Sequence, residues 1–503
     1  YLLDGQGDRI FDDGISGRQQ HVGRNVVWEW EMDRDKTYRS TVQGTAFADI
    51  TFLQDFTFSL KGDLNIRNSE NRTFRNPIIG DGQGNNGRAS RDFNRYNNNT
   101  FQQLLKWDKN FDNHNVDVLV GHESYSWNRA YHTMRKDNQT LPGNMEYANF
   151  TEISTLGGYS QDYRTESYLS RVRYNFDRKY YIDGSFRRDG TSRFHKDYRW
   201  GNFWSLGGSW VISREDFMKD LSMINNLRLR ASYGEVGNDN VGSYYAYMGL
   251  YFLTQNANRG AAYLTQLESY DLQWETSGSF GTALEGRLFD RVNIIVEYFD
   301  KRSQNLLFDV NNPLSAGGTS TGDAVSVITK NIGSIANRGV EFTTDVDVIR
   351  RSDIRLNLGF NITHYKNEIL RLPEENRENG IISGSKRYLE GHGIYDFWLY
   401  QFAGVDQMTG MALYEIDYES YHVPEFDAEN NLIPVEGLNP IDTTFLVNIG
   451  NNHYVTRINE ARRDWSGSAI PDLFGSFRTT MTYKNFTLTG LFTFSIGGKV
   501  LDY

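Results

Sequence analysis

The chain has 503 residues, a net charge of −11 and no cysteine. The lack of cysteine excludes a disulfide framework, thiolate catalysis and cysteine-ligated zinc, and the acidic balance argues against a nucleic-acid partner. No stretch approaches the roughly 18 consecutive apolar residues of a membrane-spanning helix, so a helical membrane protein is excluded. The many aromatic residues and glycines (31 Tyr, 31 Phe, 10 Trp and 47 Gly, against 8 Pro) are typical of an all-β protein.

Acidic residues crowd the first segment of the chain, where Asp4, Asp8, Asp12 and Asp13 could supply oxygen ligands to calcium. Their spacing departs from the calcium loop of an EF-hand, and acidic turns are common in proteins. The sequence therefore predicts no cofactor, and a calcium ion bound by this loop is the one alternative.

The first long β-strand pattern runs from Phe56 to Ile66. Every second residue is apolar or glycine (Phe56, Phe58, Leu60, Gly62, Leu64 and Ile66), and the residues between them are hydrophilic. Because successive side chains of a strand point to opposite faces, this segment has one apolar and one polar surface. Its length is about that of a strand that crosses a bilayer at a tilt.

The same pattern recurs along the chain, at 170–176, 227–233, 340–348, 354–363 and 486–494. Counting such segments gives roughly 14 to 18 strands. A β-sandwich would also alternate, but its strands are usually shorter and its outward face is polar. The pattern favours a large antiparallel transmembrane β-barrel, whose interior is too wide for its own side chains to fill.

Two kinds of connection alternate between the predicted strands. The short polar segments 53–55, 177–179 and 484–485 are typical of periplasmic turns. The long segments 67–95, 126–165, 303–337, 365–395 and 415–470 are rich in Asn, Gly, Asp, Arg and Tyr, and they are predicted to be extracellular loops.

Aromatic residues near the strand ends have two interpretations, an interfacial belt or the core of a sandwich. The residues in question are Trp204, Trp210, Tyr180, Tyr181, Tyr233, Tyr298, Phe299, Trp398 and Tyr483. Aromatic and polar residues also mix at 125–129 and 388–400, which suits the binding of sugar rings or peptides. Anchoring in the membrane interface would explain the same rings, and both interpretations stay open.

No motif points to catalysis. Gly82, Gly84 and Gly87 match G-x-G-x-x-G, but the surrounding sequence predicts a loop without the strand and helix that nucleotide binding requires. The histidines, including His114 and His122, lack metal-site spacing, and no nucleophile motif is found. Glu374 and Glu375 lie in a charged loop that reads as a solvated surface. The sequence predicts no catalytic, cofactor-binding or metal-binding residues, so the chain is not expected to be an enzyme; its substrate-binding residues are left unknown.

Four blocks of sequence resemble one family. The stretch from Arg171 to Asp220 contains RRDGTSRF followed by RWGNFWSLGGSWVISRE, and three further blocks agree in order, at 224–239, 331–345 and 483–500. In these blocks the chain resembles the SusC/RagA family of TonB-dependent outer-membrane transporters of Bacteroidota. The stretch 415–470 departs from the family pattern and puts any ligand site there in doubt.

The resemblance implies a 22-stranded barrel, with residues 1–503 as a barrel domain that is incomplete at both ends and a plug domain and TonB box outside this chain. It also implies an active importer of oligosaccharides or peptides in the outer membrane of a Gram-negative bacterium. The implied partners are a SusD-like surface lipoprotein, the TonB complex and a second transporter–lid pair. The family offers no invariant catalytic or ligand-binding residues to carry over.

Three other functions remain open at the level of sequence. A passive porin or structural barrel would lack a plug. A surface adhesin or receptor would use the loops without transport. A soluble all-β carbohydrate-active enzyme would need carboxylates that converge in a cleft, and it would not place apolar residues on its outer surface.

Overall fold

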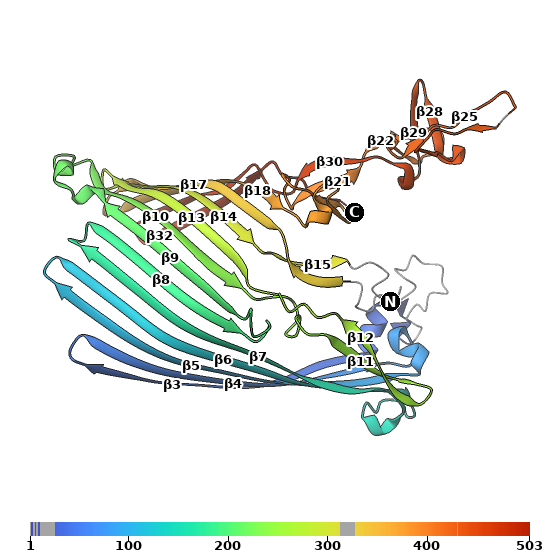
Figure 1. Cartoon of the computed structure of the whole chain (residues 1–503), viewed down its shortest axis with the longest axis horizontal. Coiled ribbons are helices and arrows are strands. Elements are labelled where there is room, and N and C mark those ends of the chain that lie inside the picture. The colour runs from blue at the N-terminus through green and yellow to red at the C-terminus, as the bar shows by residue number, and fades with distance from the viewer. Residues whose placement is uncertain are drawn as a thin grey trace.

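The computed structural model describes residues 2–3, 6, 9–10, 26–311, 327–429 and 431–502. A single antiparallel sheet of 14 strands dominates it, and neighbours in the sheet follow one another along the chain (Figure 1). Its strands are β3 (Arg34–Phe52), β4 (Phe56–Arg75), β5 (Arg88–Phe111), β6 (His114–Gln139), β7 (Phe150–Phe176), β8 (Tyr180–Thr191), β9 (Trp200–Val211), β10 (Ile224–Asn238), β13 (Glu275–Leu288), β14 (Val292–Gln304), β17 (Ser334–Arg350), β18 (Ile354–Arg371), β31 (Leu473–Tyr483) and β32 (Phe486–Ile496).

The number of strands agrees with the sequence prediction. The sheet curves through Figure 1 from β3 at the bottom to β17 and β18 at the top. Within the described residues, β3 and β32 each pair with a neighbour on one side only. The 22 strands implied by the resemblance stay a prediction, because the described chain supplies 14.

The register of the strands places the alternating residues of neighbouring strands on the same two faces of the sheet. Directly paired residues of antiparallel strands share a face. Phe58 pairs with Ile50 of β3 and Leu105 of β5, whereas the next residue, Ser59, pairs with Asp49 and with Leu104. One face therefore collects the apolar residues of each strand, and the other face collects most of the polar ones.

The apolar face continues around the whole sheet. Its members include Val118, Val172, Leu206, Leu229, Leu284, Val296, Phe342, Ile362, Phe477 and Phe492, which follow from the strand pairings. Even in central strands these side chains stay uncovered by protein, since Ile182 is 54% and Leu206 55% exposed. Apolar residues exposed along a whole sheet face are typical of contact with lipid, so this is the outer face.

The short turns predicted from sequence are confirmed. Residues 53–55 join β3 to β4, residues 177–179 join β7 to β8, and residues 484–485 join β31 to β32. Consecutive non-glycine residues have positive φ in the first two turns: Leu53 and Gln54, then Asp177 and Arg178. Such left-handed pairs are what tight hairpins need to match the twist of their strands.

The long loops are shorter than predicted, which corrects the sequence analysis. Of 67–95, only 76–87 leaves the sheet, and of 126–165 only 140–149 does, because β4 to β7 continue beyond the alternating region. The outer face of these extensions is mostly polar, although it includes Phe93 and Leu156. Backbone pairing needs no apolar face, so the strands run on after they have left the lipid, and the alternation that marked them disappears.

Other loops also differ from the prediction. Of 303–337, the hairpin β15 (Leu307–Asn311) and β16 (Val327–Asn331) is described, and residues 312–326 lie outside the described residues. A loop that the sequence analysis missed follows β10 and carries the hairpin β11 (Leu250–Asn256) and β12 (Arg259–Gln266).

The predicted loops 365–395 and 415–470 form one excursion, 372–472, without a barrel strand between them. It contains two small four-stranded sheets and projects from the loop end of the barrel (Figure 1). The first sheet holds β19 (Ile381–Ser383), β20 (Lys386–Tyr388), β21 (Asp396–Tyr400) and β30 (Arg463–Ser468); the second holds β22 (Phe402–Val405), β23 (Ala412–Tyr414), β28 (Leu446–Ile449) and β29 (Asn452–Val455). The excursion has its own buried core of Ile416, Ile441, Val455 and Ala461.

Smaller elements complete the described chain. The paired strands β1 (Leu2–Leu3) and β2 (Arg9–Ile10) and the helix α1 (Val26–Met32) precede the sheet, and short strands β24 (Tyr421–His422), β25 (Glu425–Phe426), β26 (Leu432–Ile433) and β27 (Asn439–Pro440) lie in the excursion. No helix in the described ranges is long and apolar enough to cross a bilayer.

Most members of the predicted aromatic belt face outward, as a belt requires. Register places Trp204, Trp210, Tyr180, Tyr233, Tyr298 and Tyr483 on the outer face. It places Tyr181 and Phe299 on the inner face, and Trp398 belongs to the excursion. For these three the belt prediction is wrong, because closeness to a strand end does not decide which face a ring is on.

The assignment of faces can be tested by placing the same charge on each. Leu60→Arg puts a guanidinium near the middle of the apolar band and is expected to destabilise the barrel by about 2–4 kcal/mol. Asn65→Arg puts it on the inner face of the same strand and is expected to change stability little. The measurement is the temperature at which the folded barrel converts to the slower, unfolded band on a denaturing gel. Equal losses at the two positions would contradict the assignment.

Candidate functional site

The inner face near the short turns carries paired charges. Asp117 of β6 is 8% exposed; its carboxylate lies 3.1 Å from the Arg171 guanidinium on β7 and 3.3 Å from the Lys106 ammonium on β5. Lys106 and Asp117 border a hollow of about 800 Å³ that strands β5 to β10 line. The wall here is hydrophilic and ionic.

A second network lies further around the wall. Arg230 of β10 donates hydrogen bonds to Glu285 of β13 at 2.7 Å and to Glu297 of β14 at 2.5 Å. Arg187 of β8 likewise bridges to Glu123 at 3.1 Å. Ion pairs that stay partly in water contribute about 0–1 kcal/mol each, so their main effect is to make the wall polar.

Rings and charges gather at the loop end of the inner face, in a group that we term the mouth cluster: Trp127, Tyr163, Arg193, Asp239 and Tyr244. Trp127 and Tyr163 are direct partners on β6 and β7. The ring of Tyr244 lies 4.7 Å from that of Trp127 and 5.5 Å from that of Tyr163, centroid to centroid. The guanidinium carbon of Arg193 lies 4.8 Å from the Tyr163 ring and 4.7 Å from the Tyr244 ring.

Asp239 fixes the cluster. Its carboxylate accepts hydrogen bonds from the Tyr163 hydroxyl at 2.8 Å and from the Thr191 hydroxyl at 2.6 Å. Its backbone carbonyl accepts a bond from the Arg193 guanidinium at 3.0 Å. Asp239 therefore ties the segment after β10 to strands β7 and β8.

A small hydrophobic core holds the loops of this region in place. Phe194 is 0% exposed and Leu272 1%, and they pack with Ala246 from the segment after β10. Trp274 lies against Phe194, with ring centroids 5.9 Å apart, and its indole N–H donates to the Arg199 carbonyl at 2.9 Å. The loops are ordered by burial, so they present the mouth cluster on a fixed frame.

The aromatic and basic surface continues along the wall from the mouth cluster. Tyr96 of β5 lies 6.2 Å from Trp127, and the guanidinium carbons of Arg67 and Arg129 lie 4.3 Å and 5.6 Å from its ring centroid. Flat apolar faces with hydrogen-bonding groups beside them suit sugar rings or peptide side chains.

The two segments that the sequence analysis proposed for binding lie in different parts of the structure. Residues 125–129 lie in β6, and Tyr125, Trp127 and Arg129 face the interior, so the belt explanation is wrong for Trp127. Residues 388–400 lie in the excursion, where Trp398 packs on Trp465 with centroids 5.1 Å apart.

Sequence reasoning missed Arg193 and Asp239. Both lie in blocks that carried the resemblance, RRDGTSRF and the end of 224–239, where they were read only as a family signature. In the structure these two blocks meet at the mouth cluster, which accounts for the residue types at those positions.

The remaining motifs stay without a site. Gly82 and Gly84 lie in the 3-10 turn Gly80–Asn85, and strand β5 follows it in place of a helix, so the loop prediction is confirmed. The described part of the chain contains no group of three or more His, Asp or Glu that could hold a metal. Of the calcium candidates, Asp4, Asp8, Asp12 and Asp13 lie outside the described residues.

The role of Asp239 can be measured directly. Asp239→Ala leaves the hydroxyls of Tyr163 and Thr191 without their acceptor, which is expected to cost about 1–3 kcal/mol locally and to speed amide hydrogen exchange across 191–199 and 239–249. The control is Asp197→Ala, since Asp197 is an exposed carboxylate of the neighbouring loop. Unchanged exchange in the Asp239 variant would show that the loop core alone holds the mouth.

Comparison with known proteins places this architecture in a family. Residues 3–490 match the family model described as TonB dependent receptor-like, beta-barrel. TonB-dependent receptor P39 of Formosa agariphila is 28% identical over 527 aligned residues, covering 98% of this chain and 48% of the relative. TonB-dependent receptor SusC of Bacteroides thetaiotaomicron is 24% identical over 416 residues, covering 81% of this chain and 38% of the relative. The chain thus spans less than half the length of these relatives.

Solved structures show the same fold. A chain of the RagAB peptide transporter superposes with a TM-score of 0.77 at 20% identity, covering 92% of this chain and 48% of that one. The RagAB peptide importer in its closed-closed state gives 0.79 at 20% identity, covering 98% of this chain and 51% of that one.

The resemblance first seen at residues 171–220 is thereby confirmed, since the family match extends over nearly the whole chain. The apolar outer face agrees with a barrel of the Gram-negative outer membrane, which is where this family resides. The chain belongs to the TonB-dependent receptor-like β-barrel family, with relatives of the SusC/RagA type.

Proposed function

We propose that this chain is the barrel of a TonB-dependent importer that carries oligosaccharides or peptides across the outer membrane. The observation that carries the proposal is the inner wall, which carries ion pairs on strands β5 to β8, β10, β13 and β14 and ends in the mouth cluster. A solute that sheds its water there meets ring faces and charged groups, and the ion pairs of the wall below offer it further hydrogen-bonding partners.

We place oligosaccharides ahead of peptides as the cargo. Trp127, Tyr163 and Tyr244 offer ring faces on which sugar rings stack, and the carboxylates and guanidinium groups beside them suit hydroxyl groups. Peptide cargo remains the second candidate because the fold is shared with a chain of a peptide transporter. The proposed role is transport without catalysis.

The proposal includes parts outside this chain. Residues 1–503 would be the barrel domain, a plug would close its interior, and TonB would act on that plug. A SusD-like lipoprotein would cap the long loops as a lid, and two transporter–lid pairs would form a dimer. The projecting excursion 372–472 and the ordered mouth loops offer such a lid a firm surface.

The proteins that co-purify with this chain distinguish the importer from the alternative functions. We would extract the full-length protein from its native outer membrane in mild detergent and identify its companions by mass spectrometry. A stoichiometric SusD-like lipoprotein supports the importer. A barrel recovered alone favours a porin or an adhesin, and recovery without detergent would contradict the membrane assignment.

A contact with cargo at the mouth can be tested by one ring. Trp127→Ala removes a ring face from the mouth cluster and is expected to weaken binding of the cargo about 2- to 10-fold, in a titration of the purified complex with oligosaccharide or peptide mixtures. The matched control is Trp204→Ala, because Trp204 faces outward. Equal binding by both variants would place the cargo site elsewhere on the wall.

A further inference from the structure

The outer face of strands β5 to β9 changes from mostly apolar to mostly polar over about one row of residues. The last mainly apolar row, in successive partners across β6 to β9, is Val120, Ser170, Phe186 and Trp204, of which only Ser170 is polar. The next outward row toward the loops is His122, Tyr168, Arg188 and Asn202. Because outward residues are about 6–7 Å apart along a strand, the lipid-facing band ends between these rows.

The first polar row is an organised group. The Nε2 atom of His122 lies 3.3 Å from a carboxylate oxygen of Glu166, and the Tyr168 hydroxyl donates to the same carboxylate at 2.8 Å. The rings of His122 and Tyr168 lie 5.0 Å apart. Glu166 is therefore occupied by its neighbours on β6 and β7.

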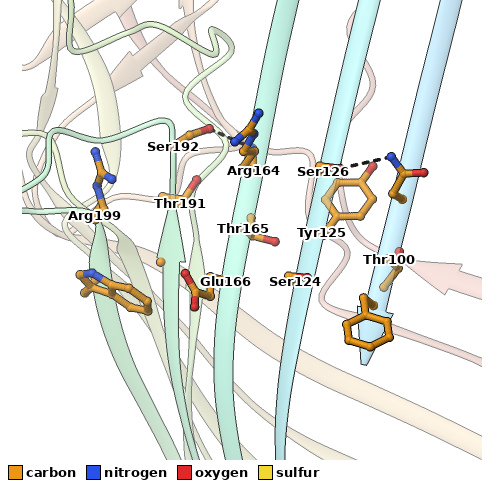
Figure 2. A pocket seen from close by; sticks show the side chains of 14 residues that line it. Thr100, Ser124, Tyr125, Ser126, Arg164, Thr165, Glu166, Thr191, Ser192 and Arg199 are labelled. Carbon is orange, nitrogen blue, oxygen red and sulfur yellow. Dashed lines mark hydrogen bonds between the residues drawn. The ribbon is translucent and has the colours of Figure 1, made fainter. Parts of the chain in front are cut away.

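A groove of about 570 Å³ lies just above this row (Figure 2). Three consecutive residues at each of β5 to β8 line the groove. The middle residue of each set faces inward; these middle residues are Thr100, Tyr125, Thr165 and Thr191. The flanking residues point outward, so the central backbone forms the floor and their side chains form the walls. Figure 2 shows two such pairs on adjacent strands, Arg164 with Glu166 and Ser124 with Ser126.

Aromatic faces border the groove. Phe101 is 44% exposed on the outer face of β5. Trp200 lies over Gly190, where an added Cβ would stand 3.0 Å from its ring, so the glycine makes room for the indole. These rings lie at the height where interfacial aromatic residues meet lipid headgroups.

Three arginines at the groove, Arg164, Arg188 and Arg199, have no carboxylate partner among the described residues. Arg164 lines the groove, and the guanidinium carbon of Arg188 lies 5.3 Å from the Trp200 ring. In the part of the chain that the structure describes, none of the three guanidinium groups has a carboxylate within ion-pairing distance, in contrast to the paired arginines of the inner wall. Unpaired guanidinium groups beside rings are suited to phosphate oxygens, which they bind bidentately.

We propose that this groove binds the phosphorylated sugar headgroup of an outer-leaflet lipid. Arg164 and Arg188 would bind its phosphate, Phe101 and Trp200 would contact its sugar rings, and its acyl chains would lie along the apolar row below. The lipid is favoured as the occupant because the groove adjoins the lipid-facing band without a break and because its charge is complementary to a phosphate. The proposal rests on the position of the barrel in the outer membrane and not on its cargo.

The test uses the full-length protein, extracted in mild detergent, freed of lipid and titrated with lipopolysaccharide while native mass spectrometry counts the bound lipid. The double variant Arg164→Ala/Arg188→Ala is expected to lose about tenfold or more in affinity. The control double variant, Arg95→Ala/Lys61→Ala, removes the same charge from exposed positions outside the groove and is expected to bind as the wild type does. Gel migration of the folded barrel confirms that both variants assemble.

Two further arms separate the sources of the signal. Lipopolysaccharide stripped of its phosphates is expected to bind the wild type as weakly as the intact lipid binds the double variant, and millimolar inorganic phosphate is expected not to displace the intact lipid. Unchanged lipid affinity in the double variant would overturn the proposal. Full displacement of the lipid by inorganic phosphate would also overturn it. A third contrary result is that the wild type binds no lipid and the double variant differs from it in oligomeric mass, which would make this face a contact between copies of the chain.

Discussion

The two-residue period of the β-strand, placed between lipid and water, is the constraint on which this structure depends. Each strand must satisfy its backbone hydrogen bonds with its neighbours, because lipid offers no partner for them. Its side chains are then sorted by parity alone, and a slip of one residue would turn charges such as Asp117 and Arg171 into the lipid. The regular alternation of polar inner residues with apolar outer residues therefore fixes the register of each strand as well as the face that meets lipid.

The same rule explains how one wall serves different surroundings along its length. Within the membrane, the outer face is mostly apolar and the inner face mostly polar. Beyond the membrane, both faces of β4 to β7 meet water, and most of their outer residues become polar while the strands continue. The mouth cluster and the outward groove lie at about this change, on opposite faces of the same strands: Trp127 and Tyr163 face inward, and Arg164 and Glu166 face outward.

The features that could be predicted from the sequence are those determined by residues close together in the chain. The alternation at 56–66, the tight turns and the all-β class were predictable, because the strand period and left-handed turn residues act within a few positions. The extents of 67–95 and 126–165 were not, since strands outside the membrane lose the pattern that marks them. The mouth cluster was not predictable either. Asp239 meets Tyr163 and Thr191 only after the segment behind β10 folds across two earlier strands, and no local pattern records that contact.

The most direct test of the account is a cysteine scan along β4, because the 503 residues contain no cysteine that would compete with the introduced one within the barrel wall. Single cysteines at 57 to 65 in the full-length protein would be exposed to a charged maleimide that does not enter lipid. The account predicts labelling at Thr57, Ser59, Lys61, Asp63 and Asn65 and none at Phe58, Leu60, Gly62 and Leu64. Labelling without a two-residue period, or with the opposite parity, would contradict the assignment of inner and outer faces from which the proposed transport path and lipid groove follow.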